Sequence, residues 1–287
     1  MRNVFQAFFT LGALLLSSQG AAVPVDLGTA GHYTILGAGV VNSTSHYAGN
    51  LSLGSEAHVF GSAGARNHLN VSPGVQVDGD LSLGTSSSIS PDLIVGGTQS
   101  VLSEADWNQV HQDMKDASAA AAALPADSVL SGISGSTIMN QTGLSPGLSV
   151  YHITGSILLG SADTWSIIGG ASDQFVINID GGMNLASGAS IVMSGGVLPE
   201  NVLFNFTGGG FGGPASIIGA TTFDGNYLAP YMYFQIGDGA IMGATRILAS
   251  GIQGNIQDIA PPIPEPTTAL LLGLGLTFLG LSHRKAA

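Results

Sequence analysis

A short β-type unit bounded by glycines recurs along the chain and limits the folds that the chain can adopt. The unit occurs at residues 49–54 (GNLSLG), 79–84 (GDLSLG) and 155–160 (GSILLG), with a looser copy at 182–187 (GMNLAS). Alternation such as Leu-Ser-Leu places apolar side chains on one face of a strand, and the flanking glycines allow tight corners. Stacked coils that cover one another's cores satisfy this pattern. Because the copies are irregularly spaced, we predict an all-β, irregular solenoid.

Further apolar runs fit the same scheme. Residues 175–179 (FVINI) and 202–206 (VLFNF) predict buried strands, each with an asparagine that points inward or forms a ladder with its neighbour. The remaining strand candidates are residues 190–193, 231–236, 247–249 and 255–257.

One helix, at about residues 104–123, interrupts the β pattern. Ser103 and Asp106 resemble a capping box, in which Asp replaces the usual Glu or Gln. Apolar side chains then recur every three or four residues, at Trp107, Val110, Met114, Ala117, Ala121 and Leu124. Pro125 ends the helix. A single apolar stripe must pack against another surface, so we expect this helix to lie along the β body.

Charge and cysteine content exclude several classes of function. Charged residues make up 8% of the chain and the formal net charge is −12. Between the two ends the basic residues are only Arg66, Lys115 and Arg246, which are too few to neutralise a nucleic-acid backbone. The chain has no cysteine, which excludes disulfides, thiol catalysis and zinc–thiolate sites.

The first 22 residues have the pattern of a secretory signal peptide. Arg2 is followed by an apolar run at residues 4–16 and then by small residues up to Ala22, where we place the cleavage site. The apolar run is short for a membrane span. The alternative is an uncleaved anchor.

The last 28 residues, 260–287, form a second non-globular segment and leave residues 23–259 as the folded domain. Pro264, Glu265 and Pro266 precede an apolar stretch at residues 267–281, and Arg284 and Lys285 lie near the end. This arrangement resembles the PEP-CTERM sorting tail. The resemblance implies export, transient anchoring in the inner membrane and processing by an exosortase-type membrane protease, with final placement at the cell surface or in the extracellular matrix. The alternative is an ordinary membrane anchor.

The folded domain resembles the ice-binding-protein-like family. A β segment, one Ala-rich helix and a longer β segment follow the order of that family over residues 26–258. The fragments that carry the resemblance are residues 145–151 (SPGLSVY), 173–179 (DQFVINI), 201–206 (NVLFNF) and 222–229 (TFDGNYLA). The resemblance implies a right-handed solenoid of triangular cross-section with the helix packed along one side.

The family resemblance also implies a function and a site. Some members bind ice through a flat face of short side chains, so adsorption to ice and inhibition of crystal growth or recrystallisation is one hypothesis. The other is a structural role in the exopolysaccharide or biofilm matrix, without ice activity. The sequence lacks a regular Thr-Ala-x-Thr or Thr-Gly-x-Asn series. The ice face that we predict lies on the coils after the helix and contains Asn184, Ser187, Ser190, Thr221, Thr222 and Thr245.

Catalytic chemistry has little support in the sequence. His58 and His68, with Glu56 nearby, form an incomplete metal-ligand pattern. Asp78 and Asp80 would share a strand face, as paired carboxylates do in polysaccharide lyases, but the only basic partner after the helix is Arg246. We therefore expect no enzyme activity, no cofactor and no metal.

Overall fold

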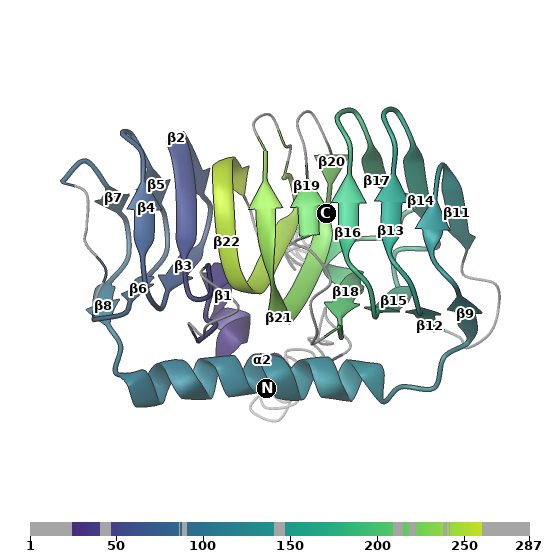
Figure 1. The fold of residues 1–287 in the computed structure, drawn as a ribbon, viewed down its shortest axis with the longest axis horizontal. Coiled ribbons are helices and arrows are strands. Elements are labelled where there is room, and N and C mark those ends of the chain that lie inside the picture. The colour runs from purple at the N-terminus through teal and green to yellow at the C-terminus, as the bar shows by residue number, and fades with distance from the viewer. Residues whose placement is uncertain are drawn as a thin grey trace, which may run out of the picture.

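The computed structural model describes residues 25–40, 47–85, 87, 91–140, 147–208, 215–217, 222–237, 240 and 242–259. Within these residues the chain forms a β-solenoid, in which three rows of strands surround one core and a long helix lies along one side (Figure 1). All strand pairs between described residues are parallel. The predicted all-β solenoid with one helix is confirmed.

We name the three rows face A, face B and face C. In spatial order, face A contains β9 (Ser128–Leu130), β12 (Leu148–Ile153), β15 (Gln174–Ile179), β18 (Val202–Phe206), the first parts of β21 (Gly225–Ile236) and β22 (Thr245–Ile259), β1 (Tyr33–Gly37), β3 (Ser62–Ala65), β6 (Leu81–Leu83) and β8 (Gln99–Val101). Face B contains β10 (Ile133–Ser134), β13 (Ile157–Leu159), β16 (Met183–Leu185), β19 (Ala215–Ile217), the second part of β21, the middle of β22, the first part of β2 (Leu51–Val59) and β4 (Leu69–Val71).

Face C consists of two groups of strands. The first is a separate four-stranded sheet of β11 (Thr137–Asn140), β14 (Thr164–Ile168), β17 (Ser190–Ser194) and β20 (Thr222–Phe223). The second contains the last parts of β22 and β2, then β5 (Gln76–Val77) and β7 (Ile94–Val95). Two short 3-10 helices, η1 (Gly28–His32) and η2 (Pro199–Asn201), precede β1 and β18.

The last strand of the domain joins the two β segments of the chain. On one side β22 pairs with β21, and on the other side it pairs with β1 and β2. The segment after the helix therefore ends in the middle of the solenoid, beside the strands with which the segment before the helix begins (Figure 1).

Helix α2 (Glu104–Ala122) spans the body from β8 to β9 and covers face A (Figure 1). Its first turn has the predicted capping box, in which Ser103 Oγ accepts from the Asp106 amide and the Asp106 carboxylate accepts from the Ser103 amide. Trp107, Val110 and Met114 are buried against outward side chains of face A. The predicted helix and its packing on the β body are confirmed.

A ladder of two asparagines fixes the far end of α2. Asn178 and Asn205 are in register on β15 and β18, and Asn205 Nδ2 donates to Asn178 Oδ1 over 2.7 Å. Asn178 Nδ2 also donates to the Ala121 carbonyl, and Asn205 Nδ2 to the Ser118 carbonyl. The asparagines that the sequence predicted as inward or ladder residues thus form a ladder that faces the helix.

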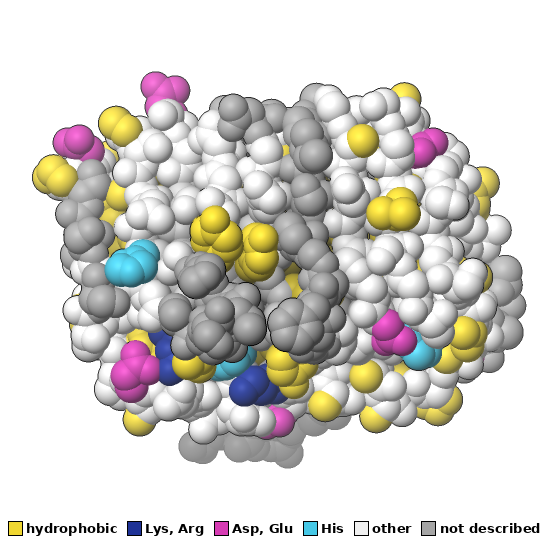
Figure 2. Space-filling model, viewed as in Figure 1, with side chains coloured by type: hydrophobic (Ala, Val, Ile, Leu, Met, Phe, Trp, Pro, Cys, Tyr) yellow, Lys and Arg dark blue, Asp and Glu magenta, His cyan; other side chains and the backbone are white. Residues whose placement is uncertain are grey.

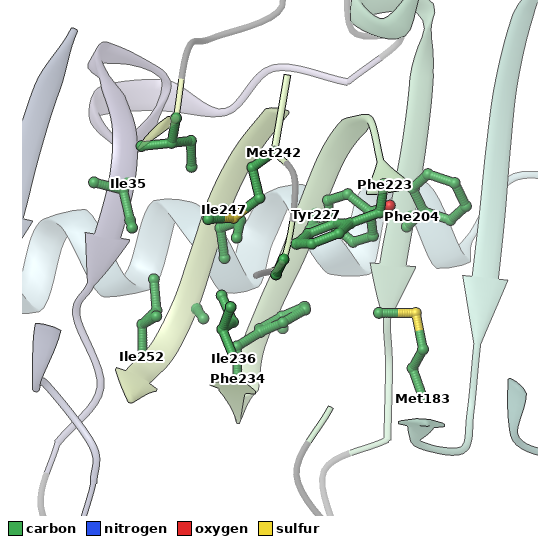
Figure 3. Close-up of a cluster of buried hydrophobic side chains, with 14 of the residues drawn as sticks. Ile35, Met183, Phe204, Phe223, Tyr227, Phe234, Ile236, Met242, Ile247 and Ile252 are labelled. Atoms are coloured by element: carbon green, nitrogen blue, oxygen red, sulfur yellow. The ribbon is translucent and has the colours of Figure 1, made fainter. Parts of the chain in front are cut away.

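The core inside the solenoid is aromatic in its central coils (Figure 3). The rings of Phe204 and Tyr227 stack in parallel with their centroids 4.7 Å apart. Phe223 and Phe234 meet the Tyr227 ring edge-on. The strands that carry these rings belong to successive coils, so ring stacking along the solenoid axis helps to fix the register between coils.

The recurrent glycine-bounded unit forms strands in all four copies, but not on one face. The copies in β2, β13 and β16 lie on face B, whereas the copy in β6 lies on face A. The middle residue points outward in each case. On face A that residue, Ser82, is buried and its hydroxyl accepts from the Tyr33 hydroxyl over 2.9 Å. The same local pattern therefore serves two different surroundings.

Candidate functional site

Hydroxyl side chains form a short ladder on the outer surface of face C. Thr164 on β14, Ser190 on β17 and Thr222 on β20 occupy the same register position in successive coils. The hydroxyls of Thr164 and Ser190 lie 3.2 Å apart. The Thr164 amide donates to Ser136 Oγ, which extends the row by one more coil.

Two further outward rows complete this surface. Ser166 lies between Ile138 and Val192 in one row, and Ser194 follows Ile168 in the next. We call Thr164, Ser166, Ser190, Ser194 and Thr222 the Thr/Ser patch. The strands that carry it contain no charged residue. Coils stack about 4.8 Å apart and outward side chains repeat about every 6.6 Å along a strand, so the patch is a small, regular lattice.

The structure separates the residues that were predicted to form one ice face. Ser190 and Thr222 lie side by side on face C, but Asn184 points outward from face B, because a corner of the coil lies between β16 and β17. Ser187 is exposed at that corner. Thr221 lies outside the described residues.

Thr245 does not belong to any outer surface, so its assignment to the ice face was wrong. Its side chain is fully buried at the start of β22, and its hydroxyl donates to the Phe223 carbonyl over 2.7 Å.

Face B presents larger side chains than the Thr/Ser patch. Its central outward row runs through Leu158 and Asn184, then through Gln235 and Gln253, and ends at Asn70. Leu158 is 54% exposed. No residue in the strands of face B is charged. In Figure 2, which looks onto the side of β13 and β16, acidic side chains lie mainly toward the margins, whereas hydrophobic ones are scattered over the surface, with one small group near the middle.

Two tyrosines on β21 and one in the turn before β2 lie near the central strands of face B. Tyr231 and Tyr233 alternate with buried residues on β21, and Tyr47 precedes β2. The rings of Tyr47 and Tyr233 are tilted against each other, with centroids 5.1 Å apart. Tyr231 is 49% exposed and Tyr47 is 38% exposed. We call these three residues the tyrosine patch.

The candidate metal-ligand residues do not assemble into a metal centre. His58 Nε2 contacts Asp78 Oδ1 over 2.8 Å, and the His58 ring packs on Phe60. Hydrogen bonds from His58 and Gln76 lower the pKa of Asp78. Among the described residues, no group of three or more His, Cys, Asp or Glu side chains could hold a metal ion.

The acidic pair considered for lyase chemistry is also divided. Asp78 interacts with His58, as above, whereas the Asp80 carboxylate accepts from the Thr98 amide at a coil corner. Arg246 lies on face A, where its Nε donates to the Tyr33 carbonyl. These three side chains have separate structural partners and form no common site.

The chain belongs to the family described as an ice-binding-like adhesive domain, which matches residues 20–257. The PEP-CTERM protein-sorting motif matches residues 262–285 and implies export followed by C-terminal processing. Pro264, Glu265, Pro266, Arg284 and Lys285 lie within this match and outside the described residues. Within the part of the chain that the structure describes, no helix is long and apolar enough to cross a membrane.

Several solved structures share the fold. An ice-binding protein from the Antarctic ascomycete Antarctomyces psychrotrophicus is 17% identical with a TM-score of 0.55, over 84% of this chain and 99% of that chain. The DUF3494 domain of Shewanella frigidimarina ice-binding protein 1 is 16% identical with a TM-score of 0.59, over 84% of this chain and 98% of that chain. An ice-binding protein from an Antarctic biological consortium is 22% identical with a TM-score of 0.53, over 84% and 92%. No curated protein matches significantly.

The sequence did not single out Thr164, Ser166 and Ser194, nor the tyrosine patch. The alternation of polar and apolar residues over 164–168 (TWSII) could have indicated an outward Thr and Ser. By contrast, Tyr47 and Tyr233 meet only because β22 joins two segments that are far apart in the sequence. No local pattern reports such a contact.

Proposed function

We propose that this chain is a non-enzymatic, exported protein that adsorbs to ice through the Thr/Ser patch and thereby inhibits crystal growth or recrystallisation. The observation that carries the proposal is the common register of Thr164, Ser190 and Thr222 in three successive coils. Membership of the ice-binding-like family supports it. The structural likeness to ice-binding proteins from Antarctomyces psychrotrophicus and Shewanella frigidimarina also supports it.

The chemistry of the patch suits contact with ordered water. A threonine offers both a methyl group and a hydroxyl at one position, and the strand backbone holds each position at a fixed spacing. No charged side chain on these strands competes for water with a strong local field. Outward Ile138 and Val192 add apolar surface between the hydroxyls. The strands that carry the patch are thus uncharged, and the row of Thr164, Ser190 and Thr222 repeats a hydroxyl from coil to coil.

Bulky substitutions on the two faces test this proposal. Ser190→Tyr or Thr222→Tyr should abolish ice-recrystallisation inhibition and leave the melting temperature nearly unchanged, because both side chains point outward. Asn184→Tyr, on face B, is the matched control and should retain inhibition. Absence of inhibition by the wild-type protein at micromolar concentration would reject ice binding. Equal loss in all three variants would reject the Thr/Ser patch as the site.

The proposed route to the surface has three steps. The export machinery removes residues 1–22, the segment 260–287 anchors the protein transiently in the inner membrane, and an exosortase-type protease processes that segment. The protein then stays at the cell surface or in the extracellular matrix. The sorting motif supports this route. Intact mass of the released protein should place its start near Val23 and its end before Pro264, whereas retention of residues 4–16 would contradict signal cleavage.

A structural role in the exopolysaccharide matrix, without ice activity, is the second candidate. Face B favours it, because the exposed rings of Tyr231 and Tyr47 make this surface less flat than a row of short hydroxyl side chains. Fractionation of cells into matrix and medium would test this role independently of any ice assay.

A further inference from the structure

We propose that the tyrosine patch on face B is a binding site for an uncharged polysaccharide. This inference gives the matrix role a ligand class and does not depend on ice binding, since the Thr/Ser patch lies on another face.

The rings are placed as platforms rather than as core residues. Tyr231 is exposed and Tyr233 is half-buried, and the buried Met232 separates them at the point where the register between β21 and β22 shifts and the chain turns from face A to face B. Tyr47 packs beside Tyr233 with a centroid distance of 5.1 Å. A tyrosine combines an apolar ring with a polar hydroxyl, which suits a sugar ring that has apolar C–H faces and a rim of hydroxyls.

The strand that carries Tyr233 is paired on both sides. The second part of β21 pairs with β19 on one side and β22 on the other, so Tyr233 lies on an internal strand. Gly251, the register partner of Tyr233, leaves room for the chain at Tyr47, because a Cβ there would lie 1.8 Å from the Tyr47 carbonyl oxygen. A pre-organised surface loses little conformational entropy when a ligand binds.

Amide side chains extend the patch along β21 and across its neighbour. Gln235 follows Tyr233 on the same side of the strand and is exposed, and its register partner on β22 is Gln253. Further along face B, Asn70 Nδ2 donates to Ser52 Oγ over 3.4 Å. An amide both donates and accepts hydrogen bonds, as is needed to pair with the hydroxyls of a sugar.

Charge selects the class of polymer. The strands of face B carry no charged residue, and the whole chain has a net charge of −12. An acidic polysaccharide would be repelled by this charge and would find no cationic partner on the face. An uncharged chain of sugars meets neither penalty and is therefore the ligand class that we propose.

Retention on insoluble polysaccharides tests the site. The exported protein should be depleted from solution by cellulose or chitin, both uncharged, but not by alginate gel, which is acidic. Tyr231→Ala and Tyr233→Ala should each weaken retention about tenfold or more, the effect of losing contact with one aromatic side chain. Tyr231→Phe keeps the ring and should retain most of the binding. An unchanged melting temperature for Tyr231→Ala shows that the fold is intact.

Two matched controls make the result specific. Leu158→Ala removes an exposed apolar side chain from the same face outside the patch, and Ser190→Tyr alters the other face; both should bind like the wild type. Failure of the wild type to bind either uncharged polymer would overturn the proposal, as would equal binding to alginate. Dimerisation that Tyr231→Ala abolishes, without polysaccharide retention, would also overturn it and identify a second copy as the occupant. Loss of ice inhibition in Ser190→Tyr with normal retention would separate the two functions.

Discussion

Face A and face B are built from the same kind of strand, but their outward side chains meet different surroundings. On face A, outward Leu203 is 1% exposed because α2 covers it, whereas on face B outward Leu158 is 54% exposed. The outward residues that α2 covers on face A are Leu36, Val150, Val176, Leu203, Leu228 and Leu248. The outward side chains of a strand in this solenoid thus join a second core where α2 covers them and form part of the surface where it does not.

Polar side chains also hold α2 against face A. Arg66 is buried, and its Nη2 contacts Glu104 Oε2 at 2.5 Å near the start of α2. Near the middle, His111 Nε2 lies 3.0 Å from the Pro230 carbonyl. With the asparagine ladder at the far end, these contacts fix the helix at three points along face A. Among the described residues, no helix covers face B or face C.

The largest effect should come from the helix side of face A. Trp107→Ala should lower the free energy of unfolding by about 3–5 kcal/mol, because a fully buried large aromatic leaves a cavity that the coils cannot close. Chemical denaturation of the exported protein measures this change. An unchanged unfolding midpoint would show that α2 does not cover face A in solution.

A leucine pair tests the comparison directly. Leu203→Ala should cost about 2–5 kcal/mol, since its side chain is enclosed between β18 and the helix. Leu158→Ala makes the same chemical change at an outward position on β13 and should stay within about 0.5 kcal/mol of the wild type. Similar losses of stability in both variants would mean that another surface covers Leu158 on face B, so that the two leucines do not differ in burial.

The sequence predicted the elements better than their assembly. Ser103, Trp107 and Met114 predicted the helix correctly, because capping and a 3.6-residue period are local signals. The glycine-bounded units reported strands for the same reason. Their distribution over faces A and B could not be predicted, since it depends on how many residues each corner uses.

The candidate site shows the same limit more sharply. Ser190 and Thr222 were predicted to lie on one strand face, and they are register partners because two whole coils align. Asn184 lies only six residues before Ser190, yet it points from a different face. Thr245 was predicted to point outward, but its side chain is buried and its hydroxyl donates to a backbone carbonyl of the preceding coil. The face from which a side chain points, and whether it is buried, thus depend on contacts between coils, and a single stretch of sequence does not contain these contacts.

The smallest effect concerns a polar contact between α2 and η1 and should depend on pH. Burial opposes ionisation of Asp113, but hydrogen bonds from the hydroxyl and amide of Thr29 and from Gln109 outweigh it and lower the pKa of Asp113. The folded state therefore binds a proton less readily than the unfolded state. The resulting stabilisation is present above the usual carboxyl pKa and is lost as the pH falls through the lowered value.

Asp113→Asn removes this titration while keeping a similar shape. At about pH 6 the variant should be less stable than the wild type by about 0.5–1 kcal/mol, the net value of a typical hydrogen bond at a partly exposed site, and the difference should shrink toward zero near about pH 2. Asp116→Asn, an exposed carboxylate on the same helix that accepts from Gln112, controls for the change in net charge. Unfolding of the three proteins across this pH range measures both differences. A gap between wild type and Asp113→Asn that widens on acidification would have the wrong sign, and would show that Asp113 does not stabilise the helix on face A as a carboxylate.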